Sequence, residues 1–292
     1  MLTLLTLVVI LVAAYWDTLA IVFRAWRNNP LYSHGYLIPV FAVVLIWMRW
    51  EPFRPPSPKD RWLGVGLLGL GLVLWIVATH FAVVTVETYS FVPSLAGLFW
   101  LVGGWHLMRW AGPAVLFLVF MFPLPAAFKQ NVLERLQHVA TLASTYVLQT
   151  LGIFAISEGN RIELEGDMQL SVIDACAGLR MGTILFALAV AMALIVRRPL
   201  WERILLLLTA IPVALLVNVV RITVTAILLK WFEGNELATH LSHDWAGYFM
   251  MPLALGLLYV ELEIMARLVI DQTDSKLATA GIRKQQRPIP RV

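Results

Sequence analysis

Long apolar runs separated by short polar segments dominate the chain. A membrane-spanning helix needs about 20 predominantly apolar residues, and a backbone inside lipid must be helical unless it closes a barrel. The pattern predicts an all-α, polytopic transmembrane helix bundle of about eight spans. The expected spans, of which the second and fifth are short, are residues 2–23, 36–50, 62–80, 91–108, 113–128, 177–196, 203–230 and 247–268.

Residues 151–175, before the sixth span, follow a different pattern. Polar and apolar residues alternate over 161–165 and again over 168–172, with Gly166-Asp167 between the two runs. Such alternation around a Gly-Asp turn predicts a small extracytoplasmic β-hairpin that leads into the sixth span. The preceding residues 129–150 are interpreted as an amphipathic helix at the outer interface. If they crossed the membrane instead, the hairpin would be cytoplasmic and the charge bias would fail.

The positions of lysine and arginine in the short loops predict the orientation of the spans. With the basic loops in the cytoplasm of a bacterium, both termini are cytoplasmic, and the protein lies in the inner membrane. Residues 1–270 then form the transmembrane domain and 271–292 a cytoplasmic, disordered tail, while Arg24 and Arg27 lie outside, against the trend. The basic groups are Arg49, Arg54, Lys59 and Arg61; Arg109; Arg197, Arg198 and Arg203; and Arg267, Lys276, Arg283, Lys284, Arg287 and Arg291.

Composition supports the same class of protein. Of the 292 residues, 60% are hydrophobic and 14% are charged, against about 25% charged in soluble domains, so lipid must cover much of the surface. Because the basic residues lie between the spans and at the C-terminus, nucleic acid is not an expected partner. With one cysteine and no metal-ligand spacing among the histidines, no metal and no cofactor are expected.

Cys176 is the first candidate for chemistry. It follows Asp174 and lies where the hairpin ends and the sixth span begins. A thiol in the first turn of a helix experiences the positive end of the helix dipole, which favours the thiolate, although Asp174 as an N-cap would partly oppose this effect. A cysteine that only packs at a helix end is the alternative.

Arg221 is the second candidate, because it lies within the seventh span. If Lys230 marks the outer interface, the backbone of Arg221 is about 13 Å below it, where a guanidinium costs at least ~2.5–3.5 kcal/mol. Intramembrane charges are functional by default. An arginine that only holds helices together is the alternative. Asn218 is three residues earlier and shares its helix face.

His243, on the loop between the seventh and eighth spans, is the third candidate. A histidine has a reference pKa near 6.5 and can carry a proton from a thiol to a leaving amine; His240 competes for this role. His80 is also expected near the outer face, whereas His106 is expected near the inner end of its span. Since Cys176, Arg221 and the loop histidines converge on one membrane face, they supply the nucleophile, cation and base of acyl transfer.

Several short motifs in this order resemble the exosortase/archaeosortase family. They are residues 33–39 (Ser-His-Gly-Tyr-Leu-Ile-Pro), 158–160 (Glu-Gly-Asn), 175–180 (Ala-Cys-Ala-Gly-Leu-Arg), 218–222 (Asn-Val-Val-Arg-Ile) and His243 followed by Gly247. Ala177 departs from the family pattern, in which serine is common at this position.

The resemblance implies a membrane-embedded, sortase-like cysteine transpeptidase with its active site on the periplasmic side. Cys176 would be the nucleophile, Arg221 the orienting cation and His243 the acid/base, supported by Asn218, Arg180, Asp174 and His240. The implied partners are secreted proteins with a C-terminal Pro-Glu-Pro-type motif, a transmembrane helix and a basic cluster. A glycan or lipid would accept the acyl group from a thioester, and water would make the enzyme a protease.

Two other classes of function remain open at this point. In a non-catalytic subunit of a polysaccharide or lipid exporter, Arg221 would bind an anionic headgroup or sugar phosphate, and Cys176 would only pack. In a membrane enzyme acting on a polyprenyl phosphate, activity would survive loss of the thiol. Reactivity of Cys176 toward thiol reagents from the outer side separates these classes from the transpeptidase.

Overall fold

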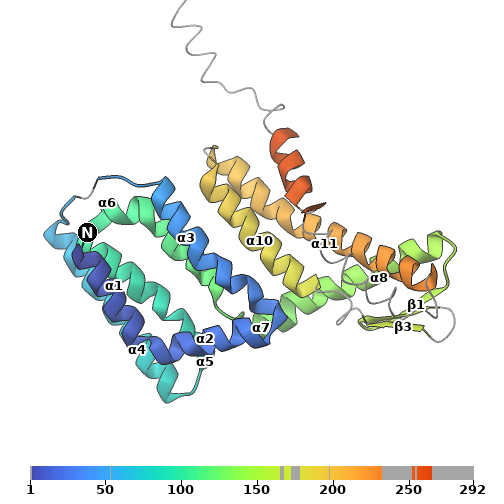
Figure 1. Cartoon of the computed structure of the whole chain (residues 1–292), viewed down its shortest axis with the longest axis horizontal. Coiled ribbons are helices and arrows are strands. Elements are labelled where there is room, and N and C mark those ends of the chain that lie inside the picture. Colours follow the sequence, from blue (N-terminus) through green and yellow to red (C-terminus); the bar gives the residue numbers. More distant parts are fainter. Residues whose placement is uncertain are drawn as a thin grey trace, which may run out of the picture.

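The structure, a computed structural model, is mostly helical with one small sheet (Figure 1). It describes residues 2–52, 54–164, 168–171, 178–196, 198–231, 252–253 and 255–264. Its elements are α1 (Leu2–Ala14), α2 (Trp16–Asn28), η1 (Pro30–Tyr36), α3 (Leu37–Met48), α4 (Pro58–His80), α5 (Val84–Tyr89), α6 (Phe91–Phe117), η2 (Leu118–Met121), α7 (Ala126–Phe128), η3 (Lys129–Leu133), α8 (Glu134–Thr150), β1 (Ala155–Glu158), β2 (Arg161–Leu164), β3 (Met168–Ser171), α10 (Gly178–Ile195) and α11 (Leu200–Trp231).

Four segments in the described part of the chain are long and apolar enough to cross a membrane. They are Leu31–Met48, Pro58–His80, Val84–Met121 and Leu200–Trp231, and the bent pair α1 and α2 makes a fifth if it counts as one span. The predicted class of helical membrane protein is therefore confirmed in its outline. The number of about eight spans stays a prediction, since α10 supplies only a shorter apolar helix, Gly182–Ile195, and both ends of 247–268 lie outside the described residues.

The predicted first span, 2–23, is not one straight helix. α1 and α2 meet at a bend of 73°. The thirteen residues of α1 reach about 20 Å at 1.5 Å per residue, less than the ~30 Å hydrocarbon layer. α2 is amphipathic and buries Thr18, Val22 and Trp26, which recur every fourth residue on one face. It runs across one end of the bundle in Figure 1.

The predicted boundary between the fourth and fifth spans falls elsewhere. The expected polar break at 109–112 is helical, and the chain bends at Gly104, where φ is +60°. Only glycine adopts this conformation readily, and a Cβ there would lie 2.9 Å from Asp60 Oδ2. The bend removes the helical acceptor of the Trp105 amide, which donates instead to Asp60 Oδ1 at 3.3 Å.

Small residues allow α4 and α6 to pack closely. A Cβ added to Gly64 would lie 2.5 Å from the backbone nitrogen of Leu101, and one added to Gly97 would lie 2.6 Å from that of Leu68. Transmembrane helices commonly associate through such small residues, because apolar side chains gain nothing by leaving lipid. This pair of helices anchors the larger core, which also includes α1, α2 and α3.

A second core joins α8, the sheet and the C-terminal half of α11. Ala140 and Leu148 of α8 pack with Ile162 and Leu164 of β2 and with Ile222 of α11. The predicted pairing of 161–165 with 168–172 is confirmed, because Arg161 lies opposite Ser171 and Leu164 opposite Met168. Its predicted extracytoplasmic placement is not tested by these contacts.

An additional strand, β1, precedes the predicted hairpin. The sheet order is β1-β2-β3, and β1 pairs antiparallel with β2. Gly159 and Asn160 connect these two strands, and Gly159 has φ +59°. The tight turn between β1 and β2 thus gives the Glu158-Gly159-Asn160 motif a structural role.

Candidate functional site

Basic residues from three predicted cytoplasmic loops meet at one end of the bundle. Arg49 at the end of α3, Arg109 of α6 and Arg203 of α11 line one cavity of about 380 Å³. Arg49 also donates a hydrogen bond to the carbonyl oxygen of Leu194, near the end of α10. The three groups therefore share one end of the molecule, as the orientation argument requires.

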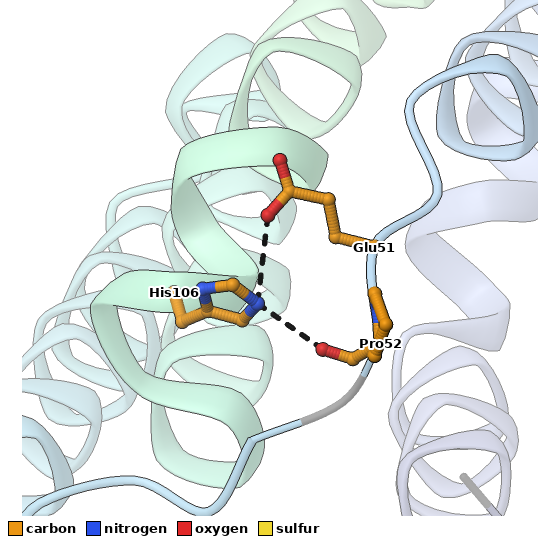
Figure 2. Close-up of polar contacts among 3 residues, drawn as sticks. All are labelled: Glu51, Pro52 and His106. Atoms are coloured by element: carbon orange, nitrogen blue, oxygen red, sulfur yellow. Dashed lines mark hydrogen bonds and ion pairs between the residues drawn. The ribbon is translucent and has the colours of Figure 1, made fainter.

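His106 lies at this same basic end. Its Nε2 is 3.6 Å from Glu51 Oε2 and 3.1 Å from the carbonyl oxygen of Pro52, as Figure 2 shows. These contacts bind the second half of α6 to the chain that follows α3. The placement agrees with the expectation that His106 lies near the inner end of its span.

The opposite end contains a second cavity, of about 230 Å³, between η1, α8, α10 and α11. Gly182 and Thr183, one turn inside α10, contribute to its wall. Most of the lining is apolar and aromatic, which is typical of ligand pockets with a few polar groups. The aromatic residues are Tyr32, Tyr89, Phe120, Phe122 and Phe128.

Three polar side chains line this second cavity, named the outer cavity because the charge bias predicts a periplasmic position for it, with buried atoms that have no hydrogen-bond partner among the described residues. These atoms are His34 Nδ1, Gln137 Nε2 and Asn218 Oδ1. Gln137 is 5% exposed and Asn218 is 8% exposed. Buried polar groups without partners are destabilising, so an amide donor and an amide acceptor in this wall are available to a polar ligand once their side chains turn toward the cavity.

The position of His34 depends on Gly35 beside it. A Cβ at Gly35 would lie 2.2 Å from Trp26 Nε1, and this indole donates to the carbonyl oxygen of Met121 at 2.7 Å. Glycine lets η1 approach α2 and the end of η2 closely. Of the Ser33-His34-Gly35-Tyr36 motif, His34 lines the outer cavity.

Arg221 lies one helical turn beyond Asn218 on α11 and is 3% exposed. The face of α8 opposite this part of α11 is polar and buried, with Gln137, Thr141 and Ser144. Ser144 Oγ donates a hydrogen bond of 3.5 Å to the carbonyl oxygen of Val219. Asn218 and Arg221 are thus both buried on α11, the helix that packs against α8 in this part of the molecule (Figure 1).

The length of α11 changes the expected depth of Arg221. Its 32 residues extend about 48 Å, well beyond the ~30 Å hydrocarbon layer, so Lys230 need not mark the interface. Arg221 lies about 32 Å along the helix from Leu200, so if Leu200 were at one boundary of the lipid, Arg221 would be close to the other. The cost of burying its charge in lipid is then smaller than the sequence suggests.

The remaining predicted site residues fall largely outside the part of the chain that the structure describes. Cys176, Asp174, His240 and His243 are outside it, and for Arg180 only the helical backbone is described, within α10. His80 is the exposed last residue of α4, and its ring packs edge-on against Phe81. Their roles stay predictions.

Sequence reasoning did not select His34 or Gln137 as site residues. The signal for His34 was available, because it belongs to the motif at 33–39 on which the family resemblance partly depends. For Gln137, the amphipathic pattern of residues 129–150 predicted only a helix at the interface, and the polar face of that helix was expected to meet water. The face is instead buried against α11, which only tertiary packing reveals.

The fold and this site define a helical membrane protein with a buried polar cluster at one end of the bundle. The family model of the transmembrane exosortases matches residues 26–260. The chain belongs to this family, and membership points to a membrane-embedded, sortase-like enzyme. No curated protein and no solved structure matches the chain.

Proposed function

We propose that this protein is a cysteine transpeptidase or protease that cleaves the C-terminal sorting signal of secreted proteins on the periplasmic face of a bacterial inner membrane. The outer cavity carries the proposal, since it joins two residues of family motifs, His34 and Asn218, with unsatisfied polar atoms beside the start of α10. Family membership supports the same reaction class.

Cys176 is the nucleophile in this proposal. Only Ala177 separates it from Gly178, the first described residue of α10, and two Cα–Cα steps span at most roughly 7.6 Å. Gly182, one turn further along α10, lines the outer cavity. Chain connectivity therefore supports a thiol at the α10 end that borders this cavity.

The polar atoms of the cavity suit a peptide group. Gln137 Nε2 is a donor and Asn218 Oδ1 is an acceptor, so a peptide carbonyl and a peptide amide of the substrate can satisfy both. The surrounding aromatic rings exclude water, which strengthens such hydrogen bonds. Arg221, one turn from Asn218, supplies the fixed positive charge for the oxyanion.

The reaction proceeds by acyl transfer. His243, or His240 in its place, takes the proton of Cys176, and the sulfur attacks the carbonyl carbon of the scissile peptide. The C–N bond breaks, the leaving amine takes the proton from the imidazolium, and a thioester remains. A hydroxyl or amine of a glycan or lipid then attacks the thioester and restores the thiol; water in this step gives hydrolysis.

Loss of the thiol tests the proposal directly. We expect Cys176→Ala to abolish processing of a co-expressed secreted protein that carries a Pro-Glu-Pro-type motif, a transmembrane helix and a basic cluster. Processing is followed as the size shift of the substrate on an immunoblot, with equal membrane levels of both enzymes verified. Undiminished processing by the alanine variant would exclude a cysteine mechanism.

Matched histidine variants identify the base and control for general damage. His243→Gln is expected to lose processing by at least about 100-fold, as for loss of a general acid–base catalyst, while His80→Gln retains it. His80 is the control because it is exposed at the end of α4. If His240→Gln alone removes activity, the base is His240 and not His243.

A further inference from the structure

The cavity at the basic end of the bundle has an excess of positive charge. Three guanidinium groups line it, from Arg49, Arg109 and Arg203, against one carboxylate, that of Glu51. Burial and the neighbouring Arg203 both lower the pKa of the Arg49 guanidinium. Like charges that gather in a partly desolvated cavity repel one another, and a bound anion would relieve this repulsion.

Trp110, which lines the same cavity, carries an unsatisfied donor. Its side chain is 6% exposed, and its Nε1 has no hydrogen-bond partner among the residues that the structure describes. An indole N–H can only donate, so it requires an acceptor. The oxygens of a phosphate group would accept from the indole and from the guanidinium groups.

An apolar cavity of about 740 Å³ adjoins the cationic cavity. The two share Trp50, Glu51 and Trp110 as wall residues, and the rest of the apolar cavity is lined by aliphatic and aromatic side chains of α1, α2, α3 and α6. Along α3 its wall runs from Pro39 to Trp50, about 16 Å at 1.5 Å per residue. This length matches one leaflet, half of the ~30 Å hydrocarbon layer.

We propose that the two cavities form one binding site for an anionic glycerophospholipid. The phosphate lies among Arg49, Arg109, Arg203 and the Trp110 indole, and an acyl chain fills the apolar cavity. A free phosphate would satisfy the cationic cavity but leave the apolar one empty. Basic pockets between transmembrane helices on the cytoplasmic side are suited to anionic headgroups. This site is separate from the proposed catalytic residues and does not depend on them.

Native mass spectrometry of the purified full-length protein tests the proposal. The protein in detergent is titrated with phosphatidylglycerol and, separately, with phosphatidylethanolamine of the same acyl chains. We expect at least tenfold tighter binding of phosphatidylglycerol. Arg49→Gln, Arg109→Gln and Arg203→Gln are each expected to weaken it about fivefold, the contribution of one basic residue near a membrane surface.

Two arginines at the other end of the molecule provide the matched control. Arg24→Gln and Arg27→Gln make the same change of charge on exposed positions of α2 that do not line the cationic cavity. They are expected to leave phosphatidylglycerol binding unchanged. An equal loss in these variants and in Arg109→Gln would overturn the site, since binding would then follow net charge alone.

Two further measurements distinguish binding of a lipid from binding of a small anion. Trp110→Phe keeps an aromatic side chain but removes the N–H donor together with the pyrrole ring, and it is expected to weaken phosphatidylglycerol binding at least threefold. Because Trp110 belongs to the core, thermal stability in detergent is measured alongside to separate loss of the donor from looser packing. Inorganic phosphate at millimolar concentration is expected not to displace the lipid. Displacement by phosphate, equal binding of the two lipids, or unchanged binding by all three cavity arginine variants would each overturn the proposal.

Discussion

Arg221 is the predicted site residue whose surroundings are clearest. It is buried at the interface between α8 and α11, one turn from Asn218. A guanidinium can donate to an oxyanion in two directions at once, whereas an ammonium acts as a point charge. The choice of arginine therefore matters for geometry as well as charge.

We expect Arg221→Lys to reduce substrate processing about 100- to 1,000-fold, the usual effect of losing one oxyanion donor. The measurement is the rate of appearance of cleaved substrate in membranes containing equal amounts of each enzyme. Arg27→Lys, on the exposed face of α2, is the control and should keep the wild-type rate. Wild-type activity of Arg221→Lys would contradict a directional role for the guanidinium.

Gln137 offers a test that separates function from stability. Replacing a buried, unsatisfied amide by an apolar group of similar size removes a destabilising feature. The free energy of unfolding of Gln137→Leu in detergent should therefore be unchanged or higher by up to about 1 kcal/mol. The same change removes a substrate hydrogen bond and should raise KM for the cleaved substrate about tenfold. Falling stability with unchanged KM would indicate a purely structural glutamine.

Two glycines of α4 differ in how closely they pack against α6. Gly64 faces the backbone of Leu101, whereas Gly66, on the same helix, has open space around its Cβ position. Gly64→Ala should destabilise the protein by about 1–3 kcal/mol through overpacking, and Gly66→Ala should be neutral or slightly stabilising through helix propensity. Thermal unfolding in detergent measures both; equal effects of the two variants would refute close packing of α4 on α6.

The sequence pattern predicted those elements in which apolar and polar residues repeat regularly over neighbouring positions. The apolar run of α4 and the alternation of β2 and β3 were identified because exposure to lipid requires consecutive apolar residues. A strand in a sheet similarly requires apolar and polar residues to alternate. The bend at Gly104 was missed, since the apolar pattern continues through it and its cause, Asp60, is distant in the sequence. The break between α1 and α2 was missed for the same reason.

The candidate site was predictable only in part. Asn218 and Arg221 stood out as polar residues within an apolar run, and both are buried on α11. Gln137 did not, because a glutamine on an amphipathic helix normally faces water. Its burial depends on the polar face of α8 meeting α11, a contact between segments far apart in the chain. Cys176 and His243 lie outside the described residues, so their convergence stays a prediction.

For the whole molecule, the two ends of the bundle differ in chemistry. One gathers Arg49, Arg109 and Arg203, and the other gathers η1, α8 and the starting turns of α10. If the arginine-rich end faces the cytoplasm, as the charge bias predicts, the β1–β2 turn faces the periplasm. The single native cysteine makes this orientation measurable.

In a Cys176→Ser background, Asn160→Cys should react with a membrane-impermeant maleimide in intact, outer-membrane-permeabilised cells. Ser57→Cys, before α4, should react only after the inner membrane is opened, because the charge bias predicts a cytoplasmic position for its loop. Mass-tagging of the purified protein reports both reactions. Labelling of Ser57→Cys in intact cells together with protection of Asn160→Cys would invert the assigned orientation.

Pro212 gives α11 a further property. A proline within a helix has no amide hydrogen for the carbonyl four residues earlier and weakens the rod at that point. Ala210, Ile211, Ala214 and Leu215, which flank Pro212, all line the outer cavity. A small change of bend there would move the C-terminal half of α11 relative to α10, together with α8 and the sheet, which share its core. A hinge in this position would let a hydrophobic helix slide in from the lipid without unfolding the bundle.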